Sequence, residues 1–515
     1  MSRTLVEIKN LTIRFPEEEN DFEAVKNVSF QVHEGEIVGV VGESGSGKSM
    51  SALALMGLLK KQAQVSSGEI FFRGENLLTM KDAERRKLQG NEMAMVFQEP
   101  MTSLNPVMKI EKQVGEALRL HTDLSKNEIH KRVVQALKEV GLDDAEAICK
   151  KYPHELSGGM RQRVMLAQAT VCSPSLIIAD EPTTALDVVV QAQILALLKK
   201  IHQEKNTSIL FISHDLNVVK ELCDRVIVMY QGEIVEEGCT REVLENPKHE
   251  YTRHLVAAYP EKKCDHHAEE EVLSLKNLNV FYEEKAGIFS KKEKKHVLRD
   301  INLTVHDGEI LGIVGESGCG KSTLCKTILG LHTQYTGSIV MKEELRPQMV
   351  FQDPFGSLNP TKTVGWILEE PLRLRGFKDR KKRKEMVLSM LDSIGLDASF
   401  VNRRPAELSG GQRQRISIGT ALMMDSKLLI ADEPVSALDV TVQSQILKLL
   451  QKLHEEKNMS MIFISHDLNV VRSLCQRVLV IYQGEIVEEG NAEEIYENPT
   501  HAYTKLLLEA SGKQS

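Results

Sequence analysis

One eight-residue stretch decides the fold: Gly42-Glu43-Ser44-Gly45-Ser46-Gly47-Lys48-Ser49, which returns later as Gly315-Glu316-Ser317-Gly318-Cys319-Gly320-Lys321-Ser322. Both copies fit the pattern G-x-x-x-x-G-K-[ST], follow an apolar run and open a helix-like stretch. The glycines let several backbone N–H groups point at one phosphate, the lysine reaches the outer phosphates, and the serine hydroxyl ligates Mg²⁺. Two such loops predict a chain that binds two nucleotides together with magnesium.

The rest of the chain is duplicated as well. Residues 211–219 return as residues 463–471, and residues 230–238 return unchanged as residues 482–490. Repeats of this kind indicate two copies of one domain. We therefore predict a first domain at 1–260, a linker at 261–271 and a second domain at 272–515.

Each copy alternates apolar, strand-like runs with helical stretches, which predicts an α/β fold with a mainly parallel central sheet. Residues 107–150 have a helical period and no strand signal, and residues 362–396 are their counterpart, so we expect a helical subdomain in each copy. The stretch from the first phosphate loop to Gln98 is longer than the matching stretch from the second phosphate loop to Gln352. We expect the additional residues, around 76–91, to form a surface excursion.

The bulk composition limits the possible function classes. The chain has 515 residues, of which 42% are hydrophobic and 27% are charged, and its net charge is −8. We find no apolar run long enough to span a membrane, no apolar core of a secretory signal and no electrostatic reason to expect a nucleic-acid partner. The eight cysteines form no C-x-x-C pair, as expected in a reducing cytosol. These observations predict a cytoplasmic protein.

Two apolar strands end in adjacent carboxylates, at Asp180-Glu181 and at Asp432-Glu433. The aspartate at the strand end can hold Mg²⁺, while the next residue points the other way and can act as a general base toward water. One strand that merely ends in acids is common, but two such strands, each beyond a phosphate loop, favour catalysis.

A second glycine-rich element lies between each phosphate loop and the acidic strand, at residues 156–160 and 408–412. A serine and two glycines ahead of a helix form a second anion cradle. Since the phosphate loop already grips the phosphates, we expect this cradle to face a nucleotide held by another domain. The residues expected to contact ATP in this way are Ser157, Gly158, Gly159, Ser409, Gly410, Gly411 and Gln412.

The order of these motifs resembles the ATP-binding cassette ATPases of transporters, and the resemblance covers nearly the whole chain. It implies two tandem cassettes, each with a parallel core sheet, a helical subdomain and an antiparallel β portion. It also implies two ATP molecules sandwiched head to tail. In that arrangement Lys48 and Ser49 face residues 409–412, and Lys321 and Ser322 face residues 157–160.

The resemblance also implies a role for single residues. Gln98 and Gln352 match the glutamine that contacts Mg²⁺, which Ser49, Asp180, Ser322 and Asp432 would share. Glu181 and Glu433 match the catalytic base, His214 and His466 match the histidine at the γ-phosphate, and Asp187 and Asp439 match a loop at the dimer interface.

Phe15 and Tyr282 are candidates to stack on adenine. Ordinary packing at a strand end is the alternative for both, and Phe22 competes for the first role. Two departures from the family pattern are Met160, where glutamine is usual, and Met50, which follows the first phosphate loop. Neither departure replaces one of the lysines or acids of the motifs, so we expect both sites to hydrolyse ATP.

A finer pattern narrows the family. Residues 97–106 and 351–360 resemble loops of oligopeptide, dipeptide and nickel importer ATPases, and residues 246–252 and 498–504 match the C-terminal motif of that family. The chain looks like both ATPase subunits fused, as in glutathione-type importers. This implies two membrane permease subunits, an extracytoplasmic substrate-binding protein and a peripheral location at the cytoplasmic face of the cell membrane.

Two alternative functions of a double-cassette chain remain at this point, and the sequence does not identify the transported solute. A fused sugar-importer ATPase usually has one degenerate site, whereas both sites are intact here, and a twin-cassette factor acting on ribosomes usually has a long charged linker. The linker carries Cys264, His266 and His267, a weak metal pattern without a fourth ligand, and we expect no iron–sulfur cluster.

Overall fold

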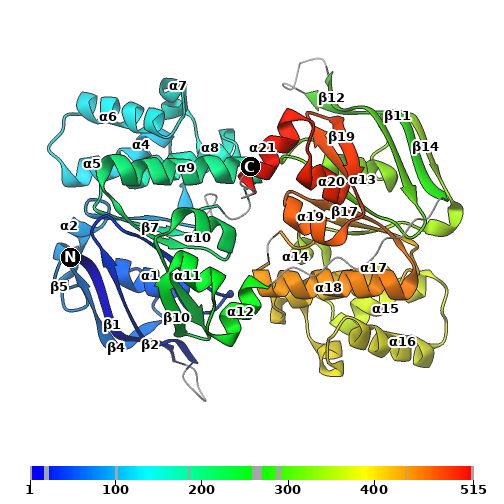
Figure 1. Cartoon of the computed structure of the whole chain (residues 1–515), viewed down its shortest axis with the longest axis horizontal. Helices are drawn as coiled ribbons and strands as arrows, with labels where there is room; N and C mark the ends of the chain where they lie inside the picture. The colour runs from blue at the N-terminus through cyan, green and yellow to red at the C-terminus, as the bar shows by residue number, and fades with distance from the viewer. Residues whose placement is uncertain are drawn as a thin grey trace. The chain divides into compact units, whose positions relative to one another are not determined.

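The computed structural model describes residues 3–16, 22–98, 103–183, 186–257, 270–285, 292–436 and 438–511. They form two compact units (Figure 1): the first contains the described residues up to Leu186 and Val190–Ala257, and the second contains Asp187–Val189 and the described residues after Ala257. The predicted linker at 261–271 lies mostly outside the described residues, as do Cys264, His266 and His267.

The first unit is built on a six-stranded sheet in the order β10-β9-β3-β8-β7-β6. Neighbouring strands are parallel except at β10, which pairs antiparallel with β9. This confirms the mainly parallel sheet that the sequence predicts. The strands are β3 (Ile37–Val41), β6 (Met93–Val96), β7 (Leu176–Asp180), β8 (Ser208–Ile212), β9 (Arg225–Tyr230) and β10 (Glu233–Cys239).

An antiparallel sheet in the order β2-β1-β4-β5 completes the β structure of this unit. Its strands are β1 (Thr4–Phe15), β2 (Phe22–His33), β4 (Gln64–Phe72) and β5 (Glu75–Asn76). Ile8 and Ile70 of this sheet share one buried cluster with Leu210 and Met229 of the parallel sheet and with Leu55 of helix α1 (Lys48–Met56). The core therefore fixes the helix that follows the phosphate loop between the two sheets.

Residues 107–150 form helices only, which confirms the predicted helical subdomain. Its helices contact α8, the helix that begins at the second glycine-rich element. The additional segment at 76–91 contains α2, a helix with no buried residue, but Leu77 of the same segment is 1% exposed and belongs to the buried cluster, so the segment is a surface excursion only in part. The remaining helices of the first unit are α2 (Asp82–Leu88), α4 (Ile110–Val114), α5 (Glu116–His121), α6 (Lys126–Glu139), α7 (Ala145–Lys150), α8 (Gly158–Thr170), α9 (Val188–Lys205), α10 (Leu216–Leu222), α11 (Thr240–Glu245) and α12 (Glu250–Val256).

The second unit repeats this plan with a six-stranded sheet in the order β15-β16-β17-β13-β18-β19 and an antiparallel sheet β12-β11-β14. The strands are β11 (Glu271–Lys285), β12 (Lys292–His306), β13 (Ile310–Val314), β14 (Tyr335–Met341), β15 (Gln348–Val350), β16 (Leu428–Asp432), β17 (Ser460–Ser465), β18 (Arg477–Tyr482) and β19 (Glu485–Asn491). The helices are α13 (Lys321–Ile328), α14 (Pro354–Ser357), α15 (Val364–Leu374), α16 (Arg380–Ser393), α17 (Gly410–Leu422), α18 (Val440–Lys457), α19 (Leu468–Leu474), α20 (Ala492–Glu497) and α21 (Ala502–Ala510).

Within the described part of the chain, every helix is too short or too polar to cross a lipid bilayer.

Candidate functional site

Each phosphate loop runs from a buried strand to a helix N-terminus, from β3 to α1 and from β13 to α13. Gly42 has no room for a side chain, because a Cβ atom there would lie 2.1 Å from the carbonyl oxygen of Met229 at the end of β9. Gly47 precedes α1 with a φ of 96°, in the left-handed region that favours glycine. The loop is thus held against β9 while the free N–H groups at the start of α1 form an anion-binding terminus.

The lysine of each loop is folded back into it. Lys48 Nζ donates to the carbonyl oxygens of Gly42 and Glu43, both at 2.7 Å, and the side chain is buried. Lys321 repeats these contacts with Gly315 at 2.7 Å and Glu316 at 2.8 Å. Backbone oxygens therefore compensate a buried positive charge at the centre of each loop.

The aspartate at the end of the acidic strand faces the serine of the loop. Ser49 Oγ donates to Asp180 Oδ1 at 2.8 Å. Burial raises the pKa of both Asp180 and Asp432 above the ordinary value of 3.8. In Asp432 the buried Oδ1 atom has no hydrogen-bond partner among the described residues. A buried carboxylate oxygen without a partner, next to a serine hydroxyl, suits a hard divalent cation.

At the glutamate after each strand, the backbone leaves the extended conformation. Glu181 and Glu433 both have a φ of 46°, a left-handed conformation that is strained for residues other than glycine and that clusters at functional sites. Gln98 Nε2 donates to Glu181 Oε2 at 2.7 Å, and Gln352 Nε2 donates to Glu433 Oε2 at 3.0 Å. The two neighbouring acids of each pair therefore have different partners.

The histidine after the next strand completes this group. His214 Nδ1 lies 3.3 Å from Glu181 Oε2, and His466 Nδ1 lies 3.2 Å from Glu433 Oε2. Burial alone would lower the pKa of His466, but the hydrogen bond with Glu433 and its charge raise that pKa above 6.5. Burial would raise the pKa of Glu433, yet His466 holds it below 4.5. The structure thus brings glutamine, glutamate and histidine together at the edge where β6, β7 and β8, and likewise β15, β16 and β17, end.

The second glycine-rich element forms a helix cap in both units. Ser409 Oγ accepts from the Gln412 N–H at 3.3 Å, and Gln412 Oε1 accepts from the Ser409 N–H at 3.0 Å, which is a capping box for α17. Ser157 Oγ likewise accepts from the Met160 N–H at 3.3 Å. Methionine has no oxygen to accept the reciprocal bond, so the predicted departure at Met160 leaves α8 with half of this cap.

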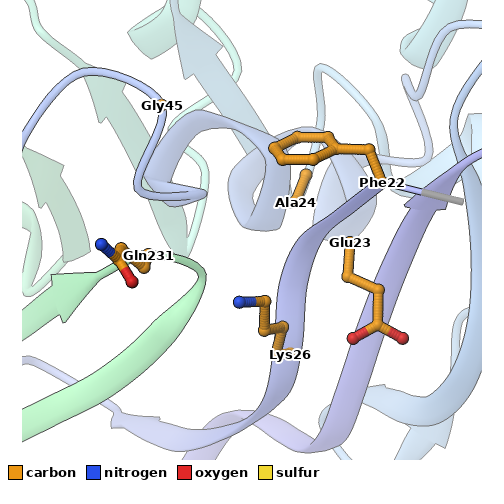
Figure 2. Close-up of a pocket in the computed structure, with 6 residues that line it drawn as sticks. All are labelled: Phe22, Glu23, Ala24, Lys26, Gly45 and Gln231. Atoms are coloured by element: carbon orange, nitrogen blue, oxygen red, sulfur yellow. The ribbon is translucent and has the colours of Figure 1, made fainter. Parts of the chain in front are cut away.

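A cavity of about 530 Å³ opens beside the first phosphate loop, a volume within the ~300–1,000 Å³ of small-molecule sites. Figure 2 shows the ring of Phe22 extending toward the turn that carries Gly45, while the side chain of Lys26 extends toward Gln231. The other lining residues are Glu23 and Ala24.

The predicted aromatic residues stand at matching strand positions but have different cross-strand partners in the two units. Phe15 is partly buried against the core and pairs in register with Phe22, whose side chain is 56% exposed. Tyr282 stands at the matching strand position of the second unit, but Lys295 is its cross-strand partner. The aromatic pair of the first unit is therefore replaced by one aromatic residue and one lysine.

The remaining predicted residues are placed as follows. Ser44, Gly45, Ser317 and Gly318 are exposed at the tips of the loops, whereas Ser46, Cys319 and Gly320 are buried. Asp439 caps α18 by accepting from the Val442 N–H at 3.0 Å, Asp187 immediately precedes α9, and Met50 packs against the core. Residues 99–102, Ala185 and Ala437 lie outside the described residues.

Sequence reasoning missed two tyrosines and one glutamine. The N–H of Glu43 donates to the hydroxyl of Tyr251 at 2.9 Å, and the N–H of Glu316 donates to the hydroxyl of Tyr503 at 2.7 Å. Gln162, buried in α8, donates to the carbonyl oxygen of Pro182 just after Glu181. The motif at 246–252 and 498–504 was visible in the sequence, but nothing in it indicated a contact with the phosphate loop.

The pair of Glu433 and His466 predicts a titration that one substitution reverses. In the chain without nucleotide or metal, His466 should titrate above pH 6.5, and in Glu433→Gln its pKa should fall, because the hydrogen bond and the charge of Glu433 are lost while burial and the charge of Lys321, which lower it, remain against the charge of Asp467 alone. Histidine proton NMR, assigned with His466→Gln, measures this pKa. Glu181→Gln is the control: it should lower the pKa of His214 and leave that of His466 unchanged, and equal shifts of both histidines would contradict the pairing.

The incomplete capping box at the start of α8 predicts that two substitutions change the free energy of unfolding in opposite directions. Met160→Gln should complete the capping box and raise the free energy of unfolding by about 0.5 kcal/mol, while Gln412→Met should lower it by about the same amount. Thermal unfolding and amide hydrogen exchange at the first turns of α8 and α17 measure both effects. A loss of protection at α8 in Met160→Gln would show that the glutamine does not accept the bond there.

Comparisons with known proteins agree with this geometry. The ABC transporter family model matches residues 25–184 and 298–436, and the model of the oligopeptide/dipeptide transporter C-terminal region matches residues 235–280 and 487–513. The chain is 41% identical to the glutathione import ATP-binding protein GsiA of Salmonella paratyphi A, with 99% of this chain and 90% of the relative covered. It is 40% identical to the protein of the same name from Escherichia coli K12, with 98% and 89% covered.

A solved structure of an archaeal ribosome recycling factor in complex with a ribosomal stalk protein matches 93% of this chain and 90% of that chain, with a TM-score of 0.63. At 20% sequence identity this likeness concerns the twin-cassette fold alone. The two family matches and the extent of the identity to the import proteins decide the affiliation: the chain belongs to the ABC transporter ATPases, as a double-cassette ATPase with the C-terminal region of oligopeptide/dipeptide transporters.

Proposed function

We propose that this chain binds two Mg–ATP and couples their hydrolysis to the import of glutathione or a related small peptide through separate membrane subunits. The observation that carries the proposal is the doubled constellation of lysine, serine, aspartate, glutamate and histidine around each phosphate loop. The cargo class is supported by the relatives, which are glutathione import ATP-binding proteins and which the alignment covers to 90% and 89% of their length.

Each unit contains the residues that hydrolysis requires. Ser49 and Asp180, 2.8 Å apart, would hold Mg²⁺ together with Gln98, and Ser322, Asp432 and Gln352 would do so in the second unit. The ion, when bound, neutralises charge on the outer phosphates. Lys48 and Lys321 would exchange their carbonyl partners for phosphate oxygens.

The glutamates would take the proton from the attacking water. Glu181 is held by Gln98 and His214 and is 14% exposed in its side chain, so that water can reach a carboxylate whose position is fixed. Glu433 has the same partners in Gln352 and His466. His214 and His466 would then contact the γ-phosphate from beside the base.

We infer that each ATP is completed by the capped helix of the other unit, as the family resemblance implies. Support comes from the cradles themselves. Ser157 and Gly158, and Ser409 and Gly410, are exposed at the starts of 13-residue helices. Their free N–H groups and serine hydroxyls suit an anion that their own phosphate loop does not present.

Phe22, rather than Phe15, is the residue that we propose to stack on adenine at the first site. It lines the cavity beside Gly45, whereas Phe15 packs partly into the core. In the second unit Tyr282 keeps this role.

The proposed partners are two integral-membrane permease subunits and an extracytoplasmic substrate-binding protein, with the ATPase peripheral at the cytoplasmic face of the cell membrane. Both the import function named for the relatives and the match to a transporter C-terminal region support this assembly.

Removing the bases should stop turnover without preventing binding. Glu181→Gln with Glu433→Gln should reduce phosphate release by about 100-fold or more, because the general base is lost, while ATP binding measured by equilibrium dialysis persists. Glu204→Gln, on the exposed side of α9, is the matched control and should retain full activity. Wild-type turnover in the double variant would exclude these residues as bases.

The proposed cargo can be tested in proteoliposomes that contain the chain, its permease subunits and the binding protein. Labelled glutathione should accumulate only with ATP supplied on the side of the ATPase, and the Glu181→Gln/Glu433→Gln chain should support none. Unlabelled tripeptides should compete, whereas maltose should not. ATP-dependent uptake of the sugar, with none of glutathione, would instead support the sugar-importer alternative.

A further inference from the structure

We propose that Tyr251 and Tyr503 are positioning residues that hold the first peptide of each phosphate loop in the shape that binds ATP. The inference rests on the proposed binding of ATP at these loops. It assigns a function in nucleotide binding to the C-terminal region that the chain shares with oligopeptide/dipeptide transporters, since Tyr251 and Tyr503 lie inside the matched residues.

The contact involves one peptide unit, the one that joins Gly42 to Glu43. Its carbonyl oxygen accepts from Lys48 Nζ at 2.7 Å, and its N–H donates to the Tyr251 hydroxyl at 2.9 Å. Both polar ends of this peptide are thereby fixed from opposite directions. The second unit repeats the arrangement at the peptide that joins Gly315 to Glu316, with Lys321 at 2.7 Å and Tyr503 at 2.7 Å.

The tyrosine is itself held firmly. Tyr251 is 8% exposed, and its ring stacks on Tyr230 at the end of β9 with a centroid distance of 4.2 Å. His249 caps α12 by accepting from the Tyr251 N–H at 3.2 Å. Glu236 accepts from the backbone N–H groups of Lys248 and His249 at 2.9 and 3.0 Å, which fixes the start of that helix.

The second unit builds the same support from equivalent residues. Tyr503 is 5% exposed, it stacks on Tyr482 at 4.2 Å, and His501 accepts from its N–H at 3.2 Å. Glu488 accepts from the N–H groups of Thr500 and His501 at 2.6 and 3.1 Å. Burial, followed by the nearby charge of Glu316, raises the pKa of Tyr503, so its hydroxyl stays neutral and offers its lone pairs at all physiological pH values.

ATP binding makes this contact decisive. Lys48 Nζ already donates to the Gly42 and Glu43 carbonyl oxygens, so phosphate oxygens that approach this ammonium group compete with the bond that holds the carbonyl end of the peptide. The hydrogen bond from the Glu43 N–H to Tyr251 then restrains this peptide. Its first residue, Gly42, lies so close to the Met229 carbonyl oxygen that a Cβ atom would clash there. Without the hydroxyl, the partly buried Glu43 N–H loses its acceptor and the loop must reorganise, which weakens nucleotide binding.

The test uses the full chain with Glu181→Gln and Glu433→Gln, so that binding is measured without turnover. In one background, Lys321→Ala restricts Mg–ATP binding to the first site, and the effect of Tyr251→Phe on that site is measured.

In the other, Lys48→Ala restricts binding to the second site, and the effect of Tyr503→Phe is measured there. Each phenylalanine keeps the ring stack and removes only the hydroxyl. We expect the Kd for Mg–ATP to rise about tenfold, the loss typical of one buried hydrogen bond. Tyr496→Phe, whose hydroxyl contacts Asn469 away from the loop, is the matched control and should not change the Kd.

A second measurement separates positioning from a purely structural role. In the chain with both glutamates intact, Tyr251→Phe and Tyr503→Phe should raise KM for ATP about tenfold and leave kcat within about twofold. The melting temperature without nucleotide should stay within about 2 °C of wild type. An unchanged Kd and KM, or a fall in melting temperature that accounts for the loss of binding, would overturn the proposal. If the chain with the native tyrosines bound no Mg–ATP, the proposed function would fail instead.

Discussion

The structure depends on a buried lysine whose positive charge must be compensated by hydrogen bonds from its own loop as long as no phosphate is bound. Lys48 and Lys321 are each 5% exposed, and backbone carbonyl oxygens surround their amines. A buried ammonium group is costly unless it is paired, so the loop has to curl around it. That curl needs a glycine against the neighbouring strand, a strand that ends just before it and a helix that starts just after it. The parallel sheet supplies the strand ends, which meet at one edge, while the glycine and the start of the helix come from the loop sequence itself.

The same edge explains how two neighbouring acids come to have separate tasks. An extended strand would send Asp180 and Glu181 to opposite faces of the sheet. Instead, the left-handed backbone at Glu181 turns its carboxylate toward Gln98 and His214, while Asp180 stays with Ser49. Conformational strain of about 1–3 kcal/mol at such a residue persists only where surrounding contacts enforce it. The bond from the Glu181 N–H to the Ile212 carbonyl, at 2.9 Å, is one of these contacts.

Much of this arrangement could be predicted from the sequence because the residues that form each part are close together in the chain. The phosphate loops, the strands that end in acids and the helical stretch at 107–150 all appear within a few residues of one another. The contact between Glu43 and Tyr251 could not be predicted, since it joins residues 208 positions apart and depends on the packing of α12 against β9. The choice between Phe15 and Phe22 was open for a similar reason: the two residues are paired across strands, and side-chain exposure distinguishes them only in the folded sheet.

The duplication provides a comparison within one molecule. The tyrosine that holds the phosphate loop, the glutamate that supports its helix and the histidine beside the base occur in both units with nearly equal distances. The full helix cap at Ser409 and the aromatic pair at Phe15 and Phe22 occur in one unit each. Contacts with the phosphate loop and with the glutamate after the acidic strand are therefore the ones that both units retain, whereas the cap and the partners of Phe15 and Tyr282 differ. On the proposed assignment, the two sites are equal in their hydrolytic residues and unequal at the helix cap and at the position that stacks on adenine.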